Sequence, residues 1–411
     1  MSDARSRQVV IAGAGIAGLT AALAFAERGH PVKLLEQAKQ LEAAGAGIQL
    51  SPNATRILRQ LGVLERLLVH AVCPEAVVLK DAATLKQLAR VPLGQSGESR
   101  WGAPYLAAHR ADLQAALMAR VAECPGIELV TGARVTGIAT GPQGVAVTAE
   151  ADGGVIEAGG QLLVGADGVW SSVRAQLAGK ETAFRKSRFS GELAWRATVV
   201  ADSAAGEAFA AIGAADCVTT FLHRGFHMVA YPVSNGRAFN LAAFTKGERI
   251  AEGWSGHADP AILSAAMRGT APALAKLVAL AGAWTAFPIH TVEQRRWTMP
   301  EGIALIGDAA HAMTPFAAQG AAMGIEDAAM LADLNADFPG DPKQSLTMWE
   351  NLRRPRVEKV IRRGALNRLA WHAWGPVALA RNLVLATRPA EKLASDLDWL
   401  YGWEQRKISR R

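Results

Sequence analysis

The chain has 411 residues, half of them apolar, which is enough for two domains with buried cores and excludes a disordered protein. Its formal net charge of +7 favours an anionic ligand or surface over a cationic one. No basic stripe is interleaved with aromatic residues and no zinc-knuckle spacing occurs. We therefore expect neither a nucleic-acid partner nor a metal site.

The cysteines and apolar segments indicate the compartment. The three cysteines are far apart and lack CxxC spacing, as expected for reduced thiols of a cytoplasmic protein: Cys73, Cys124 and Cys217. No signal peptide is expected before the first strand, which begins by Gln8. The apolar stretch 375–386 is interrupted by Arg381 and is too short to span a bilayer, so no stable membrane insertion is expected.

The N-terminus carries the pattern of a dinucleotide-binding βαβ unit. An apolar strand runs into Gly13, Gly15 and Gly18, and an Ala-rich helix follows. A second strand, residues 31–36, ends on Glu36, 18 residues after Gly18. The glycines permit a tight turn and close approach of a pyrophosphate, while the acid suits ribose hydroxyls. Because the strand, helix and acid accompany the glycines, the pattern predicts a bound dinucleotide.

A second motif lies between Ile303 and Ala329. A short apolar strand ends at Gly307-Asp308, the chain turns through Thr314-Pro315, and an Ala-rich helix starts after Gln319-Gly320. An aspartate at a buried strand end can accept hydrogen bonds from ligand hydroxyls, and the free N–H groups of a helix start favour negative charge. Taken alone, this stretch is better explained as an ordinary strand-end turn before a core helix, because Gly-Asp turns are common.

The middle of the chain repeats the arrangement. Residues 130–164 alternate around Gly-rich turns, which predicts an antiparallel ribbon, and the strand that follows ends at Asp167-Gly168 before a helix start. Upstream, Ser51 suits the N-cap of a helix that has Pro52 at its first position. Another helix starts at Arg110, which either holds a cofactor phosphate or lies on the surface.

These three strand ends, in this order, resemble the FAD-dependent single-component aromatic hydroxylases. Within that family the chain is most similar to the branch of salicylate hydroxylase, 3-hydroxybenzoate 6-hydroxylase and 6-hydroxynicotinate 3-monooxygenase. The hydroxynicotinate enzymes have a histidine at the position of Gln49, so hydroxynicotinate is a less expected substrate of this chain. The resemblance covers nearly the whole chain and includes Gly45-Ala-Gly-Ile, Pro52-Asn53, His109-Arg110-Ala-Asp-Leu, Gly191-Glu-Leu-Ala-Trp-Arg196, His227-Met-Val-Ala-Tyr231-Pro232 and Asp398-Trp-Leu-Tyr-Gly402.

The resemblance implies an α/β fold in which a Rossmann-like FAD-binding domain is interleaved with a mainly antiparallel β-sheet substrate domain, as in p-hydroxybenzoate hydroxylase. The FAD domain is expected to use residues 1–75, 100–180 and 285–345, and the substrate domain residues 76–99 and 181–284. Residues 346–411 are expected to form helices over the FAD domain. We expect most of the four tryptophans there to pack in the core or interfaces: Trp349, Trp371, Trp374 and Trp399. Strands of the substrate domain are expected at 192–200, 217–222, 227–231 and 238–244.

The resemblance also implies site residues. Non-covalent FAD would contact the glycine turn (Gly13, Ala14, Gly15, Gly18), with Glu36 at the adenosine ribose, Val135 at the adenine and Asp308 at the ribityl chain. Arg110 matches the family arginine that reaches FAD, and Asp167 belongs to the family's second motif, where it orders nearby groups. Gly320 and Ala321 begin the helix aimed at the flavin pyrimidine edge. Pro315 matches the proline beside the carbon that carries the peroxide.

His227 and Tyr231 are the candidates for contact with substrate. In a strand, residues 227, 229 and 231 share one face, so both polar side chains point the same way. Histidine has a proton affinity near neutral pH, which suits a base that deprotonates a phenol, whereas Tyr231 suits substrate orientation. The alternative is a core histidine beside a strand tyrosine. Arg196 and Arg224 predict an anionic ring substrate, although either could be a surface arginine.

The predicted function is hydroxylation of a small aromatic acid or phenol with NAD(P)H and O₂ through a flavin C4a-hydroperoxide. NADH or NADPH binds transiently, so its contacts cannot be assigned. Two alternatives stay open: a flavin monooxygenase or epoxidase of a larger lipid or secondary metabolite, and a non-catalytic FAD-binding protein. The chain is expected to be a monomer or homodimer.

Overall fold

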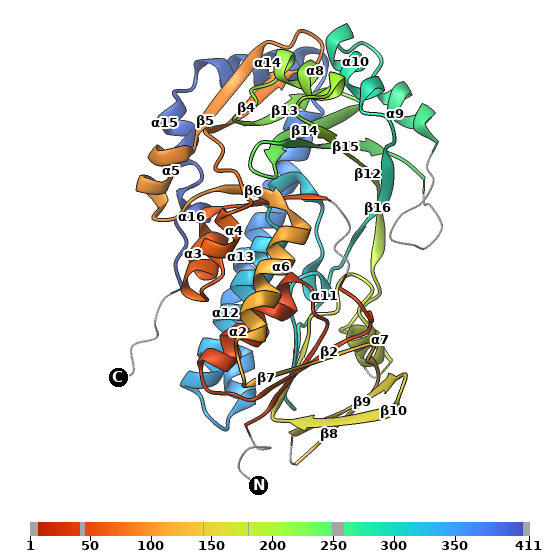
Figure 1. Ribbon diagram of the computed structural model, residues 1–411, viewed down its shortest axis with the longest axis vertical. Helices are drawn as coiled ribbons and strands as arrows, with labels where there is room; N and C mark the ends of the chain where they lie inside the picture. The colour runs from red at the N-terminus through yellow and green to blue at the C-terminus, as the bar shows by residue number, and fades with distance from the viewer. Residues whose placement is uncertain (1–6, 42–45, 143, 180, 249–258, 406–411) are drawn as a thin grey trace.

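The computed structural model describes residues 7–41, 46–142, 144–179, 181–248 and 259–405. Two large sheets lie toward opposite ends of an elongated molecule (Figure 1). Gly45, noted in the sequence, and residues 406–411 lie outside the described residues.

The lower sheet in Figure 1 has six strands in the order β17-β18-β11-β1-β2-β7. They span Thr298–Met299, Ile303–Leu305, Leu162–Gly165, Val9–Ala12, Val32–Glu36 and Ile127–Thr131. All neighbours are parallel except β17 and β18. Every residue of β1, β11 and β18 is buried, because a parallel sheet is covered on both faces. This burial explains the continuous apolar runs that the sequence shows at all three strand ends.

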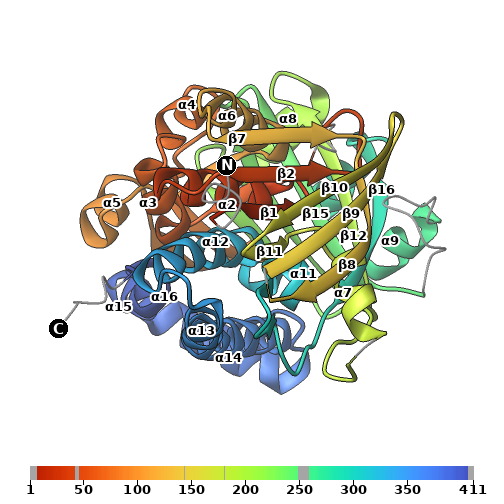
Figure 2. The same cartoon turned by 90° about the horizontal axis from the view of Figure 1, so that it is seen from below.

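Different layers cover the two faces of the six-stranded sheet. Helix α2 (Ile16–Glu27) packs on β1 and β2, flanked by α6 (Arg110–Ala122) and α12 (Gly320–Asp337). Residues 18–25 of α2 are all buried and mostly small, so these helices approach closely. On the opposite face lies the predicted antiparallel ribbon (Figure 2), formed by β8 (Arg134–Gly141), β9 (Gly144–Ala151) and β10 (Gly154–Gly160).

The upper sheet has seven strands in the order β16-β12-β15-β14-β13-β4-β5. They span Thr285–Thr291, Arg188–Val200, Ala238–Lys246, Phe226–Val233, Val218–Leu222, Ala76–Asp81 and Gln87–Pro92. Only β13 and β4 are parallel neighbours. The four strands expected in this region are therefore confirmed, with β12, β14 and β15 longer than predicted.

The two faces of this upper sheet differ in chemistry. One face carries apolar side chains such as Trp195, Phe221 and Met228, which pack under α8 (Ala204–Ile212), α9 (Pro260–Ala266) and α10 (Pro272–Leu280). Side chains alternate along each strand, so the residues between these apolar ones, including Arg196 and His227, lie on the opposite face. We call this second face, on β12, β15 and β14, the inner face.

A small antiparallel pair, β3 (Gly47–Leu50) and β6 (Leu106–His109), connects the two large sheets. The Gly47 N–H donates to Asn240 Oδ1 on the inner face at 2.8 Å, and β6 contacts β14. Three helices adjoin this pair in the chain: α3 (Pro52–Gln60), α4 (Leu64–Leu68) and α5 (Gly94–Trp101).

The C-terminal region is helical, as predicted, with α13 (Pro342–Trp371), α14 (Gly375–Thr387), α15 (Ala390–Ser395) and α16 (Asp398–Tyr401). Helix α13 packs on α12, but α14 and α15 pack on β5, so the region extends beyond the FAD-binding side to the upper sheet. Trp349 is fully buried, whereas Trp374 is 70% exposed, so the expected packing role of Trp374 is wrong. No helix within the described residues combines the length and apolarity needed to cross a membrane.

Candidate functional site

The glycine turn after β1 has the shape of a pyrophosphate cradle. Gly13 has a φ of +99°, and a Cβ there would lie 2.7 Å from the Ala166 carbonyl oxygen. A Cβ at Gly18 would lie 1.8 Å from the Gly13 carbonyl oxygen, whereas one at Gly15 would meet nothing within 4 Å. Packing therefore requires glycine at 13 and 18, and Gly15 borders open space at the N-terminus of α2. That space suits an anionic pyrophosphate.

Glu36 ties this turn to the end of β2. Its carboxylate accepts hydrogen bonds from the Ala14 N–H at 2.7 Å and the Ala38 N–H at 2.8 Å. Each carboxylate oxygen can accept a second hydrogen bond, so the group can still receive ribose hydroxyls. Val135 is buried on β8, which starts next to β2: the Ala133 N–H donates to the Glu36 carbonyl at 2.8 Å.

Asp167, just beyond β11, orders the start of α7 (Ser172–Ala178). Its Oδ2 accepts from the Ser172 hydroxyl at 2.9 Å and the Val173 N–H at 3.0 Å. Its Oδ1 is buried, and no described residue hydrogen-bonds it. Buried polar atoms normally have partners, so this oxygen fits a site completed by a ligand.

Arg174 connects the second and third motifs, a role that sequence reasoning missed. The side chain is buried and donates to the Ala309 carbonyl at 2.7 Å and the Val169 carbonyl at 2.5 Å. Burial lowers the pKa of Arg174, and the nearby Asp167 and Asp308 oppose that shift. The two aspartate-bearing turns are thus held side by side.

The Gly307-Asp308 turn presents an exposed carboxylate beside a helix start. Gly307 has a φ of +56°, and its N–H donates to Asp327 Oδ2 at 2.9 Å. Asp308 begins the short helix α11 (Asp308–His311) and is exposed, although β18 and most of α11 are buried. A Cβ at Gly320, the first residue of α12, would meet nothing within 4 Å. The Asp308 carboxylate can accept hydrogen bonds from the hydroxyls of a flavin, and the open helix start at Gly320 can lie against its electron-rich ring.

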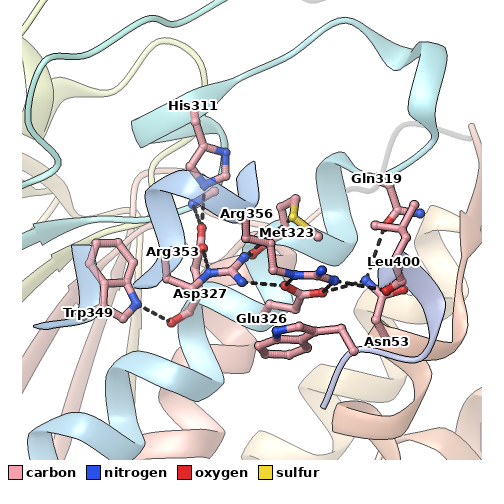
Figure 3. Close-up of polar contacts among 12 residues, drawn as sticks. Asn53, His311, Gln319, Met323, Glu326, Asp327, Trp349, Arg353, Arg356 and Leu400 are labelled. Carbon is pink, nitrogen blue, oxygen red and sulfur yellow. Dashed lines mark hydrogen bonds and ion pairs between the residues drawn. The ribbon is translucent and has the colours of Figure 1, made fainter. Parts of the chain in front are cut away.

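A buried charge network holds this turn and the start of α12 (Figure 3). Glu326 and Asp327 of α12 are fully buried, and Arg353 of α13 donates to them at 2.5 and 2.7 Å. Asp327 Oδ2 also lies 2.6 Å from His311 Nε2. Burial alone would raise the pKa of Asp327, but His311, Arg353 and the Gly307 N–H together lower it to about 2. The carboxylate therefore stabilises the fold above about pH 4, and this stabilisation is lost as pH falls toward 2.

The second arm of this network reaches the N-terminus of α12. Glu326 Oε1 accepts from Asn53 Nδ2 at 2.7 Å, and Asn53 Nδ2 also donates to Gln319 Oε1 at 3.2 Å. Ser51 occupies the N-cap position of α3, as predicted, but its hydroxyl makes no cap hydrogen bond. It donates to Asn53 Oδ1 at 2.6 Å and accepts from Gln319 Nε2 at 2.9 Å. Sequence reasoning missed this use of Ser51.

Arg353→Leu is expected to lower the free energy of unfolding by about 3–5 kcal/mol, because it removes a buried guanidinium that donates to two buried carboxylates. Glu326 then keeps its contact with Arg356, and Asp327 keeps its contact with His311. Urea unfolding followed by circular dichroism measures this change. Arg362→Leu is the matched control on the same helix: Arg362 lies 3.8 Å from Glu358 in an exposed pair, worth about 0–1 kcal/mol. Equal effects of the two substitutions would contradict a stabilising network.

On the inner face His227 packs against Phe316, the residue that follows Pro315. His227 is 1% exposed, stacks on Phe244 with ring centroids 4.6 Å apart, and lies 4.9 Å from the ring of Phe316. Phe316 follows Pro315 in the short helix η1 (Pro315–Ala317), after the turn that the sequence predicts. Burial, and then the neighbouring His372, lower the pKa of His227 well below its usual value. The ring is therefore neutral at pH 7, and one of its nitrogens carries a free lone pair that can accept a hydrogen bond.

Tyr231 lies on the same side of β14 and belongs to a polar cluster. Burial raises the pKa of Tyr231, and Arg196 and Gln49 oppose that shift. Gln49 Oε1 also accepts from the Tyr105 hydroxyl at 2.7 Å. Arg110 is exposed at the start of α6, near enough to lower the pKa of Arg196, although burial is the larger cause.

The two candidate arginines occupy different environments. Arg196 is partly buried on the inner face, with its guanidinium 4.8 Å from the centre of the Phe287 ring. Arg224 is exposed in the turn between β13 and β14. Of the two, Arg196 is thus the one that can face a bound ring.

A parallel sheet with a glycine-rich phosphate turn, a ribose-binding acid and an aspartate beside a helix start defines a dinucleotide-binding flavoprotein. The chain belongs to the FAD binding domain family, which matches residues 6–364. It is 36% identical to 3-amino-4-hydroxybenzoate 2-monooxygenase PtmB3 of Streptomyces platensis, over 100% of this chain and 99% of that protein. It is 31% identical to 3-hydroxybenzoate 6-hydroxylase of Polaromonas naphthalenivorans, over 96% of each chain.

A solved structure supports the same assignment. The Klebsiella pneumoniae protein HpxO, complexed with FAD and uric acid, superposes with a TM-score of 0.80 at 25% identity, covering 95% of each chain. The family predicted from sequence, the FAD-dependent aromatic hydroxylases, is therefore confirmed. So are the α/β fold with C-terminal helices and the FAD cofactor.

Proposed function

We propose that this enzyme hydroxylates the ring of an anionic hydroxybenzoate or aminohydroxybenzoate, with NAD(P)H and O₂ as co-substrates. The observation that carries the proposal is the inner face, where a neutral buried histidine, a tyrosine and an arginine share one wall. His227 suits the phenol of such a substrate, and Arg196 suits its carboxylate. The curated relatives named above act, by name, on benzoates that carry a hydroxyl group.

In this proposal the glycine turn with Ala14 holds the FAD pyrophosphate, and Glu36 and Val135 hold the adenosine. Asp308 accepts the ribityl hydroxyls, and Gly320 and Ala321 present helix N–H groups to the flavin ring. Asp167 and Arg110 complete the cofactor site. When bound, FAD takes hydride from NAD(P)H and activates O₂ for transfer to the ring.

The protein side chains prepare the ring for attack. His227 accepts the phenol proton, which makes the ring carbon more nucleophilic, and Tyr231 orients the substrate by hydrogen bonding. Pro315 has no N–H and holds the turn before Phe316 rigid beside the reacting ring. The aromatic side chains around His227 exclude water from this region.

The domain division is part of the same proposal. Residues 1–75, 100–180 and 292–345 form the FAD domain, and residues 76–99 and 181–291 form the substrate domain. The boundary expected at residue 285 moves because β16 (Thr285–Thr291) pairs with β12 in the upper sheet. We infer a cytoplasmic enzyme that is monomeric or homodimeric.

The test of substrate charge compares each aromatic acid with its methyl ester across a panel of hydroxybenzoates. Arg196→Met is expected to raise KM for the acid roughly 10–150-fold, the range for a lost charged hydrogen bond of about 1.5–3 kcal/mol. Its KM for the ester should change little. Arg224→Met is the matched control, because its guanidinium is on the surface. Equal stimulation of NAD(P)H oxidation by acid and ester would contradict an anionic substrate.

A further inference from the structure

A second histidine connects the buried His227 with the outside of the molecule. His372 directly follows α13, and its Nε2 lies 3.1 Å from His227 Nδ1. His227 is 1% exposed, whereas His372 is partly exposed. Two ring nitrogens at this distance share one hydrogen, so one of them donates and the other accepts.

The surroundings of His227 leave few other routes for a proton. Its ring is enclosed by the rings of Phe244, Phe316 and Trp371, none of which accepts a proton. Within the described part of the chain, the hydrogen bond of the His227 side chain runs to His372. His372 is therefore the group to which His227 can pass a proton.

Charged groups around His372 favour onward transfer of a proton to water. Burial is the largest of several causes, followed by the charges of Arg368, Lys246 and His223, that together lower the pKa of His372 to about 4. Arg368 itself donates to Glu192 Oε1 at 2.7 Å, so that carboxylate is engaged by the arginine. A histidine of such low pKa does not retain a proton at pH 7.

We propose that His372 is a proton-relay residue that carries the substrate's phenol proton from His227 to solvent. This proposal rests on the proposed function. The phenol O–H bond breaks and its proton binds His227 Nε2, while the Nδ1 proton of His227 moves to His372 Nε2. The Nδ1 proton of His372 then leaves to water. One proton enters and one leaves, and the phenolate stays in the site.

The experiment uses the FAD-loaded enzyme and 3-hydroxybenzoate, or the best hydroxybenzoate of the panel, whose phenol and phenolate differ in absorbance. Stopped-flow mixing without NAD(P)H follows ionisation of the bound phenol at several pH values. His372→Phe keeps an aromatic ring against Phe316 but removes both nitrogens, and His372→Gln keeps a hydrogen-bond partner for His227 that cannot pass a proton. Both variants are expected to ionise the substrate at least about tenfold more slowly, with partial rescue by added imidazole.

Three controls separate a relay from a packing role. FAD content and the rate of flavin reduction should stay within about twofold of wild type, and His70→Phe, a change of an exposed histidine, should leave ionisation unchanged. A variant at His372 with wild-type ionisation rates at every pH overturns the relay alone. Slower ionisation in the Phe variant but not in the Gln variant also overturns it, because packing or hydrogen bonding then suffices. A wild-type enzyme that hydroxylates no member of the panel overturns the proposed function and the relay with it.

Discussion

Replacing His227 by alanine is expected to reduce hydroxylation about 10²–10⁴-fold, the usual effect of removing a general base. The ring is buried and neutral at pH 7, since burial and then His372 lower its pKa, so one ring nitrogen has a free lone pair for the phenol O–H. FAD should remain bound, because the cofactor cradle is built from other strands. Hydroxylated product is measured against NAD(P)H consumed.

The same variant should also uncouple the reaction, with NAD(P)H oxidation yielding hydrogen peroxide in place of product. His70→Ala is the matched control, since His70 is exposed and lies outside the inner face. Stacking on Phe244 and the hydrogen bond to His372 are equally compatible with a core histidine. Normal rate and normal coupling in His227→Ala would therefore assign His227 to the core.

The parts of the fold that sequence predicted correctly depend on local patterns. Each of the three strand ends consists of a short apolar run, a glycine or aspartate turn and a helix start, all within about 25 consecutive residues. The inner face was predictable for the same reason: alternation along one strand places His227 and Tyr231 on one side. The sequence also offers a reason to exclude Arg224 from the substrate-binding residues, because the His-Arg-Gly segment before β14 is typical of an exposed turn.

The buried network under the flavin end of α12 was not predictable in this way. Glu326 bonds Arg353, 27 residues away, and Asn53, 273 residues away. Acidic and basic residues on helices usually lie in solvent, so composition gives no reason to expect these in the core. The only indication in the sequence is a pairing between two helices. Two adjacent acidic residues on one helix could pair with two arginines that lie one turn apart on another, Arg353 and Arg356.

Trp374 shows the opposite error. Its size favours burial, yet it is 70% exposed beside α14, a helix with no buried residue. On α14 the exposed side chains include Val377 and Leu383, while Arg381 turns inward and donates to the Ala370 carbonyl at 2.8 Å. Which side of an amphipathic helix faces the protein is decided by such tertiary contacts.

Asp308→Ala is expected to weaken FAD binding roughly 10–150-fold, because it removes a charged acceptor whose hydrogen bonds contribute about 1.5–3 kcal/mol. The Asp308 side chain is exposed, so its removal should change the stability of the apoprotein little. The stabilisation that excess FAD gives to the folded state should fall in step with the affinity. Flavin fluorescence on dilution and thermal unfolding with and without added FAD measure the two effects.

Glu36→Ala should also lower FAD occupancy, but by a second route. Its carboxylate accepts from two backbone N–H groups, including that of Ala14 in the glycine turn, so the apoprotein should lose stability as well. Glu36→Gln keeps one acceptor oxygen and should be intermediate. Asp202→Ala, at an exposed aspartate after β12, is the control for loss of a surface charge. If both alanine variants kept a full complement of flavin through dilution, the assignment of Glu36 and Asp308 to the cofactor would be wrong, and the unbonded oxygen of Asp167 would be the next acceptor to test.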